Sequence, residues 1–352
     1  MPRNPAAAPP VDDAIKTSIS AGKSRGPLDR RLSVAPMMDW TDRHCRYVHR
    51  LFSPHALLYT EMINAKAILR GDRARLLAHD PAEHPVALQL GGSDPGELAE
   101  AAAIGAAAGY AEINLNCGCP SDRVREGAFG ACLMLEPATV AACVERIRAA
   151  VRVPVTVKCR IGVDRHDDYR FFETFAAAQA DAGVAALIVH ARSAILGGLS
   201  PKENREVPPL RYEVAYRLKR ERPSLVVVLN GGIGTIAAVR EHLRHGIDGV
   251  MLGRAAYHRP ALLAELETAI LDAGFRAPAA DEILAAIVVY ARRETAAGTR
   301  LHSITRHLHG LVAGTGGARA WRRFLGGLAQ RPDADADTLS AALPLIRGRI
   351  AA

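Results

Sequence analysis

The residues with the clearest capacity for chemistry lie in one stretch, 113–122, which reads Ile-Asn-Leu-Asn-Cys-Gly-Cys-Pro-Ser-Asp. It begins as an alternating strand that places Asn114 and Asn116 on one face. It then reaches a Gly-Cys-Pro turn, which continues neither a strand nor a helix smoothly. We therefore expect Cys119 on a loop at the carboxyl end of a strand. A free thiol, with a pKa near about 8.5, is mostly protonated at neutral pH and yields its proton more readily than a hydroxyl, so this position suits a proton donor.

Eight short apolar or β-branched runs, separated by longer Ala-rich stretches, predict the elements that position this loop. The predicted strands are 32–36, 56–61, 86–90, 112–116, 155–160, 186–190, 226–230 and 249–252. The stretches between them predict helices, with glycines at or just past several ends, at 95–109, 137–151, 169–183 and 235–246. Eight alternations favour an α/β fold of the closed (β/α)8 TIM-barrel type. An open doubly wound sheet is the alternative.

In such a barrel the active site lies at the carboxyl ends of the strands. Polar residues end five of the predicted strands on one face, namely Gln89, Asn116, Lys158 with Arg160, His190 and Asn230. Any one of them could simply emerge from a strand into solvent. Their recurrence at the same relative place on successive strands favours a common site.

Glycines follow the last two predicted strands. Asn230 precedes Gly231 and Gly232, and Gly253 with Arg254 follows the eighth strand. Glycines let backbone N–H groups approach a phosphate, a helix amino end favours its charge, and an arginine can neutralise it. The pattern predicts a phosphorylated ligand such as FMN, with a sugar phosphate as the alternative.

Several motifs between residues 31 and 327 carry a resemblance to a known family. They are 35–42 (Ala-Pro-Met-Met-Asp-Trp-Thr-Asp), 60–62, 89–92, 114–124 with its Asn-x-Asn-x-Gly-Cys-Pro core, 157–162, 189–192 and 230–233. On these motifs the chain resembles the tRNA-dihydrouridine synthases, flavin-dependent reductases of uridine in tRNA. Within that family, residues 198–205 and 303–307 resemble the A-type branch, which modifies positions 20 and 20a of the D loop.

The resemblance implies a barrel followed by a small all-α domain, and reduction of the C5–C6 bond of uridine to 5,6-dihydrouridine. Reduced FMN would give a hydride to C6, Cys119 would give a proton to C5, and NADPH would reduce the FMN again. We expect residues 29–262 to form the FMN-binding catalytic barrel and residues 263–352 a helical tRNA-binding domain. The Ala/Pro/Ser-rich composition of residues 1–28 predicts a disordered extension, about which the resemblance says nothing.

The resemblance also implies roles for individual residues. FMN would contact Pro36, Met37, Met38, Gln89, Lys158, His190, Asn230, Gly231, Gly232, Gly253 and Arg254. The tRNA would contact Asn116, at the uracil, and also Lys202, Arg205, Arg319 and Arg322. Lys158 and Arg160 would hold the N1–C2 region of the flavin, while His190 would either bind its phosphate or assist at the base. Cys117 has no family match, and its spacing from Cys119 differs from the usual zinc-ligand spacing, so we expect no metal.

The charge of the C-terminal region supports an RNA partner independently. The chain carries 45 Lys and Arg against 37 Asp and Glu, a formal net charge of +8. Seven arginines lie within residues 292–323, against Glu294 alone. Arg319 and Arg322 are one helical turn apart, and with Trp321 between them the pattern favours phosphate contact and stacking over a merely solvated face.

The chain has no apolar run that could span a membrane, and its start lacks a signal-peptide core. Its six cysteines are typical of reduced thiols in so long a chain. We therefore expect a cytoplasmic monomer. Two other functions stay open at this point: an FMN barrel oxidoreductase acting on a free pyrimidine such as dihydroorotate, and a non-catalytic tRNA binder or folding aid.

Overall fold

The structure, a computed structural model, describes residues 28–121, 127, 129–329, 331 and 334–346. Nearly all of the predicted disordered extension, up to residue 27, therefore lies outside the described residues. The same holds for residues 122–124, the end of the motif that contains Cys119.

Eight parallel strands form one closed barrel in sequence order, and the last strand pairs with the first. They are β1 (Leu32–Val34), β2 (Leu57–Asn64), β3 (Val86–Gly91), β4 (Glu112–Cys117), β5 (Val155–Cys159), β6 (Ala186–His190), β7 (Val227–Asn230) and β8 (Gly249–Leu252). The predicted (β/α)8 barrel is confirmed, and the open doubly wound sheet is excluded. The largest difference from prediction is in β2, which continues to Asn64 after a shift of register between Tyr59 and Met62.

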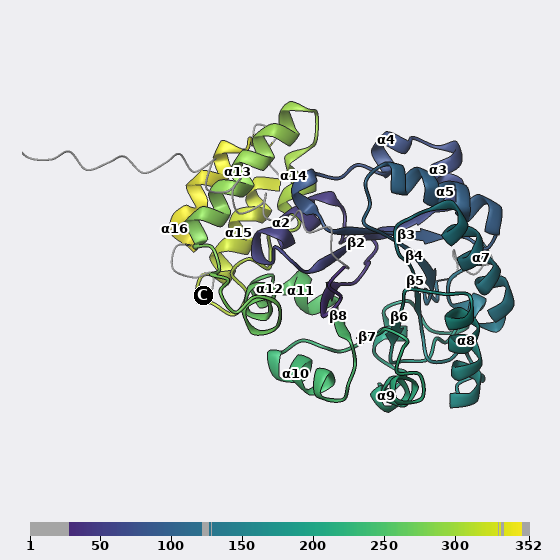
Figure 1. Ribbon diagram of the computed structural model, residues 1–352. Coiled ribbons are helices and arrows are strands. Elements are labelled where there is room, and N and C mark those ends of the chain that lie inside the picture. The colour runs from purple at the N-terminus through teal and green to yellow at the C-terminus, as the bar shows by residue number, and fades with distance from the viewer. Residues whose placement is uncertain (1–27, 122–126, 128, 330, 332–333, 347–352) are drawn as a thin grey trace, which may run out of the picture.

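Helices follow the strands and surround the barrel (Figure 1). Several of them begin where the sequence supplies a side-chain acceptor for free backbone N–H groups, as Asp42, Asp94, Asp168 and Thr235 do. The helices up to the end of the barrel are α2 (Arg43–Phe52), α3 (Ala65–Arg70), α4 (Arg73–Leu76), α5 (Pro95–Ala107), α7 (Pro137–Ala150), α8 (Tyr169–Asp181), α9 (Tyr212–Glu221), α10 (Ile236–Arg244), α11 (Arg254–His258) and α12 (Ala261–Leu266).

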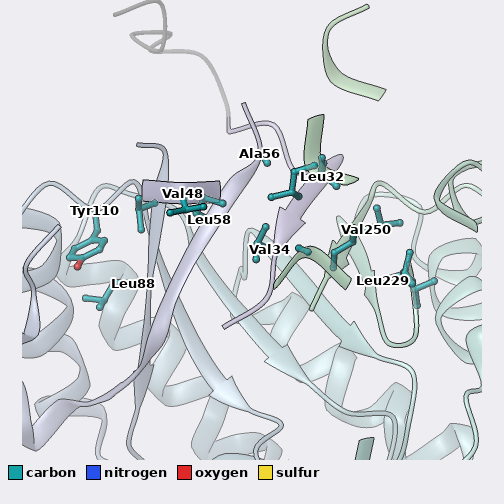
Figure 2. Packing of buried hydrophobic residues seen from close by; sticks show 14 of the residues in the cluster. Leu32, Val34, Val48, Ala56, Leu58, Leu88, Tyr110, Leu229 and Val250 are labelled. Atoms are coloured by element: carbon teal, nitrogen blue, oxygen red, sulfur yellow. The ribbon is translucent and has the colours of Figure 1, made fainter. Parts of the chain in front are cut away.

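The alternation of side chains along the strands divides the core in two. One set faces the surrounding helices; Figure 2 shows Leu58 of β2 near Val48 of α2, and Leu32 of β1 near Val250 of β8. The other set fills the barrel interior with Ala35, Leu57, Tyr59, Ala87, Ile188, Val228 and Met251. Burial on both faces explains why the strands are nearly continuous apolar runs.

The C-terminal region is helical and lies beside the barrel (Figure 1). It contains the π-helical turn η4 (Glu267–Leu271), α13 (Ala280–Ala296), α14 (Leu301–Thr305), α15 (Ala318–Ala329), the 3-10 turn η5 (Asp337–Ala342) and α16 (Leu343–Ile346). The boundary that we predicted after residue 262 falls inside α12, and the division into two domains stays a prediction.

Trp321 lies at the centre of this region. Its side chain is fully buried, and its indole Nε1 donates a hydrogen bond of 2.7 Å to the carbonyl oxygen of Leu308. The predicted stacking of Trp321 on a nucleobase is therefore wrong, because the ring faces the core of the helical region. Trp321 lies between Arg319 and Arg322 in the sequence, but in the helix its side chain is buried and theirs are exposed on the other face of α15.

Asp42 ties the loop after β1 to the C-terminal helices. It caps α2 by accepting hydrogen bonds from the backbone N–H groups of His44 and Cys45. Its other oxygen lies 2.7 Å from a guanidinium nitrogen of Arg306 and 3.0 Å from Nε2 of His307. Burial opposes ionisation of Asp42, but these donors and charges outweigh it and hold the pKa of the carboxyl well below its usual range. The contact fixes the loop beside the cavity described next.

Candidate active site

A cavity of about 630 Å³ opens at the carboxyl ends of the barrel strands. All of the residues predicted to contact the flavin line it, together with Asn116, Cys119, Arg160 and Arg205. Lys202, Arg319 and Arg322 do not line it and are exposed. The fold therefore brings together the polar strand ends that the alternation pattern had placed on one face.

The loop after β4 presents Cys119 to this cavity. The side-chain oxygen of Asn116 accepts hydrogen bonds from the backbone N–H groups of Gly118 and Cys119, both at 3.0 Å. Arg160 Nε donates to the carbonyl oxygen of Gly118 at 3.1 Å, and Cys119 Sγ lies 3.4 Å from the hydroxyl of Ser121. The thiol is half-buried on a loop that is fixed from both sides.

Cys117 and Cys119 are held in different environments although one residue separates them. Cys117 ends β4, is fully buried in the apolar layer beneath the helices, and is paired in register with Cys159 of β5. Burial raises the pKa of the Cys117 thiol well above its usual range. Cys117 therefore packs in the core, and Cys119 alone of the two is exposed to the cavity.

The amide of Asn116 has partners within the protein. Its oxygen holds the Cys119 loop, and its Nδ2 donates to the side-chain oxygen of Gln89 at 2.9 Å. One N–H of Nδ2 remains for another acceptor. A contact with uracil, which stays a prediction, would thus be added to a role in shaping the loop.

Lys158 gives the cavity a half-buried positive charge. Its ammonium donates to the side-chain oxygen of Asn230 at 3.1 Å, and within the described part of the chain it forms no ion pair with a carboxylate. Burial, and then the nearby Arg160, lower the pKa of Lys158 to about 8. At neutral pH the lysine is still charged, so this side of the cavity favours an anionic or electron-rich ligand.

His190 ends β6 next to these cations. Burial, and then Arg160 and Lys158, lower the pKa of its imidazole well below the usual range. The ring is therefore neutral at physiological pH, with one N–H donor and one acceptor nitrogen. It can bind a ligand through either nitrogen without adding charge.

Arg160 connects two loops beside the cavity, and its predicted contact with the flavin stays a prediction. Besides Gly118, its guanidinium donates to the carbonyl oxygen of Asn204 at 2.9 Å, so it connects the Cys119 loop to the loop after β6. The Asn204 amide is itself buried and bonded to the backbone of Ile195. Arg160 also lines the cavity.

Two glycines after β7 shape the opposite wall of the cavity. Gly231 and Gly232 have φ angles of 119° and 69°, in the left-handed region that favours glycine. A Cβ atom on Gly231 would lie 2.7 Å from the His190 ring, and one on Gly232 would lie 2.7 Å from Leu210. Because these two glycines have no side chains, the backbone of this wall can lie close to His190 and Leu210. Arg254, at the same wall, pairs with Glu206 at 2.7 Å.

The chemistry of the lining fits a flavin mononucleotide. The cavity combines apolar side chains such as Met37 and Met62 with the half-buried ammonium of Lys158 and bare backbone at Gly231 and Gly232. The apolar side chains suit a flat heteroaromatic ring, and the ammonium suits the electron-rich edge of that ring. The bare backbone suits a phosphate group.

Sequence reasoning did not assign a role to several residues of the lining, among them Trp40, Met62 and Ser121. Trp40 stacks on Tyr257 of α11, with ring centroids 4.3 Å apart. Met62 lies in the part of β2 beyond its predicted end. All three lie inside motifs that we had recognised. Their position within these motifs was the sequence feature that could have identified them.

Six of the seven arginines of residues 292–323 fall into two groups. Arg292, Arg293 and Arg306 pair with carboxylates from other parts of the chain, at positions 337, 80 and 42 respectively. Arg319, Arg322 and Arg323 project from α15, are exposed, and have no ion pair within the described ranges. Arg300, at the start of α14, is also exposed and has no ion pair there, so α15 carries three of the four arginines of this window that have no ion pair among the described residues.

Comparison with known proteins agrees with this arrangement. The model of the dihydrouridine synthase (Dus) family matches residues 33–345. The chain belongs to the dihydrouridine synthase family. A relative from Xanthomonas campestris pv. campestris named tRNA-dihydrouridine(20/20a) synthase is 59% identical over 304 residues, which cover 86% of this chain and 90% of the relative.

Relatives of the same name occur in other bacteria. The one from Yersinia pestis is 50% identical, with 94% of this chain and 95% of the relative covered. The one from Pseudomonas aeruginosa is 51% identical, with 92% and 97% covered. The fold is also shared with the old yellow enzyme homologue from Zymomonas mobilis, at 14% identity and a TM-score of 0.50, covering 68% of this chain and 88% of that one.

Two negative findings apply to the part of the chain that the structure describes. None of its helices is both long enough and apolar enough to cross a membrane. No group of three or more His, Cys, Asp or Glu side chains in it is arranged to hold a metal ion.

Proposed function

We propose that this chain reduces uridine to 5,6-dihydrouridine in tRNA, at positions 20 and 20a of the D loop, as the names of its relatives state for them. The observation that carries the proposal is the placement of Cys119, on a doubly anchored loop, in the same cavity as the residues that fit a flavin. The cofactor is FMN, the reductant is NADPH, and the enzyme acts as a monomer in the cytoplasm.

The chemistry divides between a bound group and the chain. When bound, reduced FMN supplies the hydride that reaches C6 of the uracil. Cys119 Sγ gives its proton to C5, and the Ser121 hydroxyl, 3.4 Å away, can donate a hydrogen bond to the sulfur after the proton has left. Asn116 keeps the loop in place during this transfer, and solvent then returns a proton to the sulfur.

The remaining side chains bind and orient. Lys158 holds the electron-rich edge of the ring, the walls at Gly231, Gly232 and Gly253 leave room for the phosphate, and neutral His190 donates or accepts one hydrogen bond. The target uridine leaves its stack and enters the cavity beside Cys119, because the thiol cannot reach a base inside a helix. Lys202 and Arg205, on the exposed loop after β6, contact the tRNA near the cavity entrance.

The two alternative functions are less well supported. An oxidoreductase for a free pyrimidine would use a similar cavity but would have no need for the unpaired arginines of α15. A non-catalytic tRNA binder would have no need for a half-buried lysine in the cavity that has no carboxylate partner among the described residues. Mass-spectrometric mapping of dihydrouridine in tRNA from a strain that lacks this protein separates the three. We expect loss of the modification at positions 20 and 20a alone, and unchanged tRNA would refute the proposal.

Replacing Lys158 with methionine should weaken FMN binding while it stabilises the flavin-free protein. A hydrogen bond to a charged group contributes about 1.5–3 kcal/mol, so the dissociation constant for FMN should rise about 10- to 100-fold. In the flavin-free protein the partly desolvated ammonium of Lys158 costs stability at pH 7. The pKa of Lys158 is about 8 in the folded protein and about 10.4 in the unfolded chain. The cost therefore disappears as the pH rises from the first value to the second. The excess stability of the variant should therefore shrink over this interval, as measured by urea unfolding.

Lys219→Met is a matched control. Lys219 is largely buried but pairs with Asp248 at 2.7 Å, on the outside of the barrel. This variant should lose stability and keep its affinity for FMN. If Lys158→Met behaved in the same way as Lys219→Met, Lys158 would have a structural role only.

A further inference from the structure

A chain of hydrogen bonds crosses the barrel interior from the amino end of β4 to the Cys119 loop. Thr156 Oγ1 donates to Glu112 Oε1 at 2.6 Å, and Asn114 Nδ2 donates to Thr156 Oγ1 at 2.9 Å. Gln89 Nε2 donates to Asn114 Oδ1 at 2.8 Å, and Asn116 Nδ2 donates to Gln89 Oε1 at 2.9 Å. The chain connects β3, β4 and β5, and its members are buried.

Both ends of this chain fix its direction. At the loop, the backbone N–H groups of Gly118 and Cys119 can only donate, so Asn116 must present its oxygen to them. At the other end, a carboxylate paired with a guanidinium can only accept, so Thr156 must donate to Glu112. The amides between them then have one orientation that satisfies every group. Reversing any one of them would leave buried donors facing donors, which is costly away from water.

Glu112 is held firmly at its end. Arg30 donates to one carboxylate oxygen through two nitrogens, at 3.1 and 2.5 Å. The hydroxyl of Tyr59 donates to the other oxygen at 2.6 Å, beside Thr156. No solvent reaches the Glu112 side chain. The buried carboxylate of Glu112 and the Cys119 loop are thus opposite ends of one polar network inside the barrel.

We propose that Glu112 and Thr156 are positioning residues for the Cys119 loop. By imposing one direction on the amides of Asn114, Gln89 and Asn116, they ensure that the oxygen of Asn116 faces the loop backbone and holds the thiol at the cavity. They touch neither the flavin cavity nor the thiol. The importance of Glu112 and Thr156 for catalysis rests on the proposed role of Cys119. Their effect on the order of the Cys119 loop does not depend on that role.

The test is hydrogen exchange of the backbone amides of Gly118 and Cys119 in protein without tRNA. Thr156→Val keeps the shape of the side chain and removes its hydroxyl, which interrupts the chain and frees the amides to rotate. We expect exchange at these two amides to become about tenfold faster. Thr156→Ser keeps the hydroxyl and should stay within about twofold of wild type.

Two further variants keep the test decisive. Gln89→Met breaks the chain at another link and should reproduce the faster exchange, which covers the case in which Thr156→Val does not fold. Ser33→Ala removes a buried hydroxyl that donates to the carbonyl oxygen of Val250 and takes no part in the series of hydrogen bonds from Glu112 to Asn116. It should leave hydrogen exchange at Gly118 and Cys119 unchanged.

Three results would overturn the inference: unchanged exchange at Gly118 and Cys119 in Thr156→Val, equal effects of the serine and valine variants, or faster exchange spread over β3, β4 and β5 as a whole. Dihydrouridine formation, measured on the same samples, separates this inference from the proposed function. A local change in exchange in a protein that never modifies tRNA would refute the function and retain the positioning role.

Discussion

Replacing Cys119 with alanine should slow the reoxidation of the reduced flavin by tRNA at least about 100-fold, while reduction of the flavin by NADPH stays unchanged. General acid catalysis by a positioned side chain typically contributes about 10²- to 10⁴-fold, and Cys119 is the acidic group that the loop after β4 presents to the cavity. Stopped-flow absorbance of the flavin measures the two half-reactions separately. The hydride donor and the reductant are left intact, so the loss should fall entirely on the tRNA-dependent step.

Cys132→Ala is the matched control for this experiment. Cys132 is also half-buried, but its thiol donates to the carbonyl oxygen of Phe129 and does not line the cavity. The reduced flavin of Cys132→Ala should be reoxidised by tRNA at the wild-type rate. Equal dihydrouridine formation by Cys119→Ala and wild type would refute the assignment of the proton donor, and a loss of bound flavin in Cys119→Ala would assign the cysteine to cofactor binding instead.

Replacing both Arg319 and Arg322 with alanine should raise the dissociation constant for tRNA about 10- to 100-fold at physiological salt. The two side chains are exposed on α15, and neither has an ion pair in the described ranges, so their charges are available to phosphates. Each lost phosphate contact should also reduce the slope of log affinity against log salt concentration by about 1. Binding titrations at several salt concentrations give both quantities, and the flavin content should stay at the wild-type level.

Arg146→Ala with Arg152→Ala removes the same charge from the opposite side of the molecule. Arg146 lies on α7 and Arg152 just after it, and both are exposed. Figure 1 places α7 across the barrel from α15. This pair should change tRNA affinity by less than about threefold. An equal effect of the two pairs would mean that net charge alone attracts the tRNA, and loss of flavin from the α15 variant would mean that its arginines are structural.

The barrel could be predicted from the sequence because its information is local. Each strand is a short apolar or β-branched run, and the polar residue at its end, such as Lys158 or Asn230, follows the alternation of side chains. The (β/α)8 arrangement then places these ends together without further assumptions. The roles of individual residues came from the resemblance, because spacing alone does not distinguish a flavin contact from any other polar strand end.

The errors and omissions have the opposite cause, since they depend on contacts between distant parts of the chain. The basic window looked more charged than it is, because the partners of Arg292, Arg293 and Arg306 lie far away in sequence. Glu112 and Thr156 were not singled out, because which strand residues bond to each other follows from the register of three strands. Trp321 was misread because sequence adjacency does not show which face of a helix is buried.

The burial of Trp321 has a consequence for how tRNA choice can change over evolution. The indole and its bond to Leu308 fix the inner face of α15, so the identity of the outer residues has little effect on folding. Under the proposed contact of α15 with tRNA, substitutions on its outer face would change the surface that meets the tRNA at small thermodynamic cost. The cavity is built from the ends of the barrel strands, so such substitutions would leave its lining unchanged. The proposed recognition and the proposed chemistry could then be redesigned independently, with α15 as the place to begin.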